Sequence, residues 1–160
     1  MDSQPQQRPV IPLAYRLLLT TIEPLIALCG ALQALHNPDD YTSAMTRGSV
    51  LFSPGSTFLY TELAGAWLYF AFVEAVVLRL FADDLRLWRL LCAGMLLSDV
   101  AWAHSVAQAV GGWAVWLDVG GWSAMDHAMF WTSAPIAVVR LLIVLGAGVG
   151  KTGEKEKKGE

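Results

Sequence analysis

The stretch Leu85–Val110, LRLWRLLCAGMLLSDVAWAHSVAQAV, decides the fold, because it is mostly apolar over more than the ~20 residues a helix needs to cross a bilayer. Three further segments meet the same requirement, at residues 11–35, 58–81 and 127–149. The 160-residue chain is 55% hydrophobic with a mean hydropathy of +0.46, more apolar than an ordinary soluble domain. The sequence therefore predicts an all-α integral membrane protein, a four-helix bundle in one domain over residues 11–149.

Charge in the loops and tails predicts how the chain crosses the membrane. If the N-terminal tail is cytosolic, eight cations gather on the cytosolic side and only Arg47 lies opposite. The eight are Arg8, Arg79, Arg86, Arg89, Lys151, Lys155, Lys157 and Lys158. Cytosolic loops are enriched in Lys and Arg, so we expect both tails, residues 1–10 and 150–160, to be cytosolic. The final KKGE resembles the dilysine retrieval signal of endoplasmic reticulum membrane proteins, with a solvated charged tail as the alternative.

Several classes of function lack their signatures in this sequence. The formal net charge is −3 and no basic stripe is present, which argues against a nucleic-acid partner. Cys29 and Cys92 lie in apolar runs without CxxC spacing, which is typical of small core residues. The chain contains no P-loop, GxGxxG or HExxH motif, so we expect chemistry without a metal or a cofactor.

Acidic residues near the middle of the predicted helices are the candidates for chemistry, since an ionisable group inside a membrane is costly. Counting residues from the helix ends places Glu23 and Asp99 near the midplane, and Glu62 and His104 in the lumenal half. No Lys or Arg is expected at the depth of the three carboxyls. We expect Asp99 and Glu23 to form an acid and base pair, in either order, with Glu62 and His104 positioning a nucleophile. Asp99 and His104, about 140° apart on one helix, do not pair directly.

Other polar and aromatic residues are expected to line a substrate pocket. Asp126 and Ser133 are seven residues apart and share one face of the fourth helix. Trp102 shares a face with Asp99, and Tyr69 is placed to line the pocket from the second helix. Packing is the alternative role for Tyr69 and His104.

Two features are expected to shape the bundle rather than react. Glu74 and Arg140 fall in the cytosolic half of the second and fourth helices, where they can form a structural ion pair. Pro24 lacks the N–H that the Thr20 carbonyl would otherwise accept, which kinks the first helix. Pro135 has the same effect in the fourth helix, and both kinks favour a cavity between helices.

The motifs in three spans resemble a known group of proteins. Tyr15-Arg16 and Ile22-Glu23-Pro24 stand in the first span, an acidic residue in the second, and Ser98-Asp99 followed by His104 in the third. This pattern is similar to small fungal four-helix membrane proteins of secondary-metabolite clusters, the ascofuranone-type terpene cyclases and the aurovertin- and citreoviridin-type epoxide hydrolases. The resemblance implies an enzyme that acts after a flavin monooxygenase has epoxidised a polyketide or terpenoid. It would protonate the epoxide oxygen and let water or an internal hydroxyl attack.

Two other functions stay open at this point. A sterol-isomerase-like enzyme, similar to emopamil-binding protein, would also use membrane carboxyls, and it would shift a double bond without gaining oxygen. A non-catalytic membrane scaffold or lipid-binding protein would need no acidic residues at the midplane.

Overall fold

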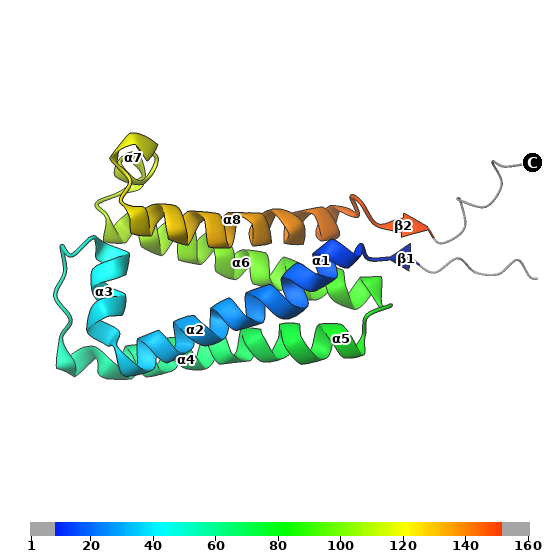
Figure 1. The fold of residues 1–160 in the computed structure, drawn as a ribbon, viewed down its shortest axis with the longest axis horizontal. Helices are drawn as coiled ribbons and strands as arrows, with labels where there is room; N and C mark the ends of the chain where they lie inside the picture. Colours follow the sequence, from blue (N-terminus) through cyan, green and yellow to red (C-terminus); the bar gives the residue numbers. More distant parts are fainter. Residues whose placement is uncertain (1–8, 152–160) are drawn as a thin grey trace, which may run out of the picture.

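The computed structural model describes residues 9–151 and contains four long helical segments (Figure 1). These segments are Leu13–His36, Pro54–Leu80, Leu85–Ala109 and Ala124–Leu145, each long and apolar enough to cross a membrane. The prediction of four helices of membrane-spanning length is confirmed, and their bounds differ from the expected ones by a few residues. The fourth begins earlier than expected because Ser123 and Asp126 form a capping box. It ends earlier because Gly146 turns the chain out at a φ of 77°.

Two of the four segments are interrupted by a wider, π-helical turn. The first segment consists of α1 (Leu13–Leu17), the π-helical turn η1 (Leu18–Ile22) and α2 (Glu23–His36). The second consists of the 3-10 turn η2 (Pro54–Ser56), α4 (Thr57–Phe72), the π-helical turn η3 (Val73–Val77) and α5 (Leu78–Leu80). The third and fourth are the unbroken helices α6 (Leu85–Ala109) and α8 (Ala124–Leu145). Turns of this kind are often found at functional sites, and both lie next to acidic residues.

The long helices pack as two pairs that share a core at one end only. Helix α2 lies along α4, and α6 lies along α8 (Figure 1). All four segments contribute to the buried cluster Ile11, Leu19, Leu78, Trp88, Cys92, Ile136 and Ile143. Farther along, Ala31 and Ala34 pack on Ala64 between α2 and α4 alone. The two pairs therefore converge at one end and separate towards the other.

Helix α3 (Pro38–Thr46) lies across the end where the pairs separate, in the connection between the first two predicted helices (Figure 1). Tyr41 packs against the alanine cluster of the α2 and α4 pair, whereas Met45 packs against residues of α6. The helix ends at Arg47, whose φ of 53° is left-handed. Nε of Arg47 lies 3.0 Å from a carboxylate oxygen of Asp126 in α8. Helix α3 thus bridges the two pairs.

The two ends of the described chain meet beyond the convergent end of the bundle. Strand β1 (Pro9–Val10) pairs antiparallel with β2 (Gly150–Lys151). If the four long helices cross a membrane, both strands therefore lie on the same side of it. Short loops at α7 (Trp113–Trp116) and the 3-10 turn η4 (Val119–Gly121) lie at the opposite end (Figure 1). The lysines of the final KKGE lie outside the described residues.

Candidate active site

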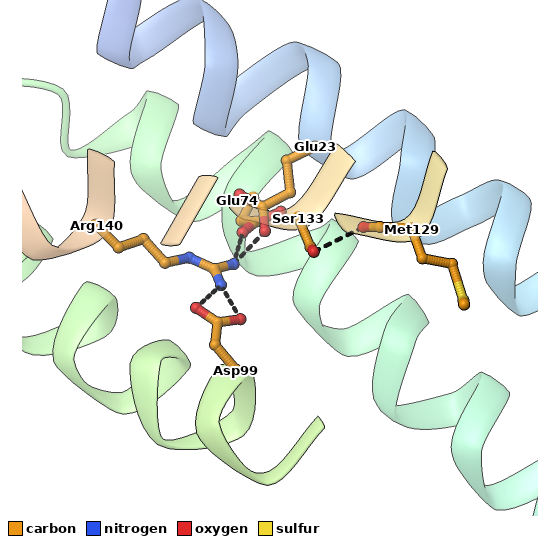
Figure 2. A network of polar contacts seen from close by, with 6 residues as sticks. All are labelled: Glu23, Glu74, Asp99, Met129, Ser133 and Arg140. Atoms are coloured by element: carbon orange, nitrogen blue, oxygen red, sulfur yellow. Dashed lines mark hydrogen bonds and ion pairs between the residues drawn. The ribbon is translucent and has the colours of Figure 1, made fainter. Parts of the chain in front are cut away.

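Arg140 of α8 lies at the centre of a buried cluster with acids from three other segments (Figure 2). Its Nη1 donates to both carboxylate oxygens of Asp99, at 2.6 and 2.7 Å. Its Nη2 donates to Oε1 of Glu74 at 2.6 Å and also to Oε1 of Glu23. Arg140 is 3% exposed and Glu74 is fully buried. One guanidinium therefore joins three carboxyl groups inside the part of the molecule that would cross the membrane.

This cluster corrects one expectation and extends another. The sequence predicts no cation at the depth of Glu23 and Asp99, and that prediction is wrong, because Arg140 contacts both. Side chains on a helix lean towards its N-terminus, so the long arginine reaches about a turn beyond the position of its own backbone. The ion pair between Arg140 and Glu74 is present as expected, within a larger network.

The two π-helical turns bring the glutamates together. Glu23 follows η1 directly, and Glu74 lies inside η3. These two turns pack against each other, and both glutamates reach the same arginine nitrogen. Pro24 leaves the carbonyl of Thr20 without its helical donor, as the sequence predicts, and Nη2 of Arg79 donates to that carbonyl at 2.6 Å. The irregular backbone is therefore paired with a side chain from the neighbouring segment.

The acid cluster forms part of the wall of a cavity of about 360 Å³. Glu23, Asp99 and Arg140 line it, and Asp99 is the most accessible of the three, with 30% of its side chain exposed. The remaining lining is largely apolar and includes Ile26, Ala27, Met45, Trp67, Phe70, Trp102, Met125, Met129 and Ile136. The cavity thus joins a charged end to an apolar body, which is the usual composition of a site for a hydrophobic small molecule.

The cavity opens between the two helix pairs. Its exposed lining residues are Cys29 and Gln33 on α2 and Met125 and Thr132 on α8. These two helices belong to different pairs, so the opening faces outwards between them rather than along the bundle axis. At the far end α3 contributes Tyr41, and burial raises the pKa of its phenol to about 12, with the neighbouring Tyr60 adding to the shift. Tyr41 therefore remains a neutral hydrogen-bonding group at physiological pH.

Some atoms of the cluster keep unused hydrogen-bonding capacity. Within residues 9–151, the buried atoms Oε2 of Glu23, Oε2 of Glu74 and Nε of Arg140 have no hydrogen-bond partner. Buried polar atoms are paired in most proteins, so each such atom requires an explanation. In the same range, no group of three or more His, Cys, Asp or Glu residues is arranged to hold a metal ion.

Two residues expected beside the pocket do line the cavity. Trp102 projects into it from α6 and Ser133 from α8. The hydroxyl of Ser133 donates to the carbonyl of Met129 at 2.7 Å, in the preceding turn of α8 (Figure 2). Ser98, next to Asp99, also lines the cavity. Hydroxyl groups from α6 and α8 therefore line the cavity together with the acids.

Four other expected site residues lie elsewhere. Glu62 and Tyr69 are exposed on the outer face of α4, because they are seven residues apart and α4 packs on α2 through the opposite face. His104 is exposed on α6, where its Nδ1 accepts from Nε1 of Trp113 at 3.2 Å. Asp126 is fully buried in its ion pair with Arg47 and in the cap of α8. The prediction that these four residues lie at the pocket is therefore wrong.

Other residues that form the cavity are not among those predicted from the sequence. Trp67 lies directly against Gly30, where an added Cβ would come within 1.5 Å of the indole ring. The glycine was the available signal for a close contact between α2 and α4. Tyr41 and Met45 are not predicted because no helix is expected between residues 35 and 58, although Asn37-Pro38-Asp39-Asp40 is a helix-start pattern.

Comparison with known proteins gives one family match. The family model described as "Domain of unknown function (DUF7704)" matches residues 8–150, which covers the four helices, the acid cluster and the cavity. No curated protein and no solved structure matches this chain. Since the match extends over most of its length, the chain belongs to the DUF7704 family.

Proposed function

We propose that this protein is a membrane-embedded enzyme that opens an epoxide on a hydrophobic polyketide or terpenoid by acid and base catalysis. One observation supports this function above the others. Asp99 and Glu23, joined by Arg140, line the charged end of an otherwise apolar cavity that opens between α2 and α8. A substrate dissolved in the bilayer would reach the cavity through that opening.

The charge count of the cluster supports proton transfer. Three carboxyl groups face one guanidinium, and like charges so close together in a medium of low dielectric do not all ionise. The cluster can therefore hold both a protonated carboxyl and an ionised one. Arg140 keeps the ionised form stable and orients Asp99 through the contacts of Nη1 with both of its carboxylate oxygens.

The reaction uses these two forms in turn. A protonated carboxyl gives its proton to the epoxide oxygen while the carbon–oxygen bond breaks. Water, or a hydroxyl of the substrate, bonds to the released carbon, and its proton passes to the ionised carboxylate. The product is a diol after hydrolysis or a cyclic ether alcohol after cyclisation, and the cluster regains its starting number of protons. Asp99 and Glu23 are the two acids in contact with the cavity. Glu74 is not among the lining residues, and its role would be to position Asp99 and Glu23.

Orientation and location are part of the proposal. The paired strands β1 and β2 lie on one side, and the bias of eight cations against Arg47 favours the cytosol for that side. Residence in the endoplasmic reticulum membrane is part of the same proposal. The epoxide itself must come from an oxygenase acting earlier on the same molecule, for which a flavin monooxygenase is our candidate functional partner.

The test compares two acid-to-amide variants in microsomes. Asp99→Asn should slow the conversion of epoxidised prenyl and polyene substrates by a factor of about 100 or more, because the amide cannot transfer the proton. Glu62→Gln is the matched control, since that acid is exposed on the outer face of α4, and it should keep the wild-type rate. Mass spectrometry in oxygen-labelled water separates hydrolysis from cyclisation. Wild-type turnover by Asp99→Asn would remove this residue from the mechanism, and a double-bond shift without ring closure or water gain would indicate an isomerase.

A further inference from the structure

We propose that the cavity selects hydrophobic ligands that carry a positive charge next to the apolar chain, such as long-chain tertiary amines. The inference rests on the proposed function, because a cation beside the acid cluster resembles the positive charge that develops on carbon as a protonated epoxide opens. It goes further by naming a ligand class that binds without reacting.

The first support is the excess of acids at the charged end. Nη1 of Arg140 is occupied by Asp99, and Nη2 by Glu23 and Glu74. One guanidinium balances one carboxylate, so two carboxyl groups are left for protons or for another cation. An ammonium group of a ligand can take the place of a proton there. The same carboxyls would repel an anionic headgroup, because the charges have the same sign.

The second support is an accessible acceptor at the charged end. Asp99 lines the cavity and 30% of its side chain is exposed. Protonated tertiary amines carry one N–H donor, which can bind this carboxylate. Glu23 lines the same wall and is only 9% exposed, so its charge is little screened by solvent. A ligand ammonium can therefore donate to Asp99 and is also attracted by the carboxyl of Glu23.

The third support is the lining beyond the acids. Trp67, Trp102 and Tyr41 bring three electron-rich rings to the cavity, and such rings attract cations as well as apolar chains. Met45, Met125 and Met129 add flexible, polarisable side chains that adapt to an alkyl tail. The volume of about 360 Å³ is that of a small-molecule pocket, which suits a single-chain amine.

Equilibrium binding tests the inference directly. Radiolabelled N,N-dimethyldodecylamine and its neutral counterpart N,N-dimethyldodecanamide are measured on the full-length protein in phosphatidylcholine nanodiscs, with empty nanodiscs subtracted. The amine should bind about tenfold more tightly than the amide, the scale of a partly desolvated cation among carboxyls and rings. Glu23→Gln and Asp99→Asn should each reduce this preference several-fold. Glu62→Gln, which removes the same charge outside the cavity, should leave it unchanged.

The binding measurements support or refute the inference without any measurement of epoxide turnover. Equal binding of the amine and the amide to the wild-type protein would overturn it, and this comparison needs no variant to fold. A preference that survives Glu23→Gln and Asp99→Asn in well-folded protein would also overturn it, since the charge would then be sensed elsewhere. Charge-selective binding without conversion of any epoxide would uphold this inference and refute the proposed function. Epoxide turnover without charge-selective binding would uphold the proposed function and refute this inference.

Discussion

Replacing Arg140 by glutamine tests whether one cation holds the four helical segments together. The substitution removes the charge that contacts Asp99, Glu23 and Glu74 and leaves three carboxyls without a cation, of which Glu23 and Glu74 are buried. Removing one partner of a buried ion pair costs about 3–5 kcal/mol, much of it from the groups left unpaired. At about 2–4 °C per kcal/mol for a chain of this size, the melting temperature should fall by about 6–20 °C.

The assay is thermal unfolding of purified protein in detergent, followed by size-exclusion chromatography of the fraction that remains folded. Arg86→Gln is the matched control, because Arg86 is exposed in the first turn of α6 and should change the melting temperature by less than about 2 °C. Arg140→Lys should be intermediate, because an ammonium group cannot reproduce the fork that contacts both Asp99 and the glutamates.

A second substitution separates the loss of charge from the loss of packing. Adding Glu74→Gln to Arg140→Gln removes the most deeply buried of the stranded carboxyls, which is fully inaccessible in the structure. The double variant should therefore be more stable than Arg140→Gln alone, with a coupling of about 1–3 kcal/mol. If Arg140→Gln melted within 2 °C of the wild type, or if the two effects were additive, the four side chains would not form the cluster described above.

Two further substitutions test the walls of the cavity. Gly30→Ala puts a Cβ within 1.5 Å of the Trp67 ring, so it should lower stability by about 1–3 kcal/mol and weaken amine binding. Gly65→Ala is its control, with no atom within 4 Å of the added Cβ, and a destabilised Gly65→Ala alongside a neutral Gly30→Ala would contradict the packing. Arg47→Gln breaks the contact of α3 with Asp126, a buried acid, and should cost about 1–3 kcal/mol by thermal unfolding. Faster hydrogen exchange confined to residues 38–46 should accompany it, and unchanged exchange there would mean that α3 is held by other contacts.

The membrane-spanning pattern was predictable because it depends on local quantities. Length and hydropathy of a segment decide whether a helix can cross a bilayer, and neither requires knowledge of a neighbour. The same holds for the carbonyl of Thr20, whose missing helical donor follows from the covalent structure of Pro24. Helix α3 was missed because its start pattern also fits a turn, and only the space between the separated helix pairs shows what its apolar residues cover.

The composition of the candidate site was decided by tertiary structure. Depth along a helix can be counted from the sequence, and it selected Glu23 and Asp99 as midplane acids, both of which line the cavity. Counting says nothing about which face of a helix meets a partner, so Glu62 was placed among them although it points away from α2. Nor does it include the reach of a side chain, which lets Arg140 join acids from three other segments. Rotation about the helix axis and side-chain direction are set by packing between helices, and that packing exists only in the folded chain.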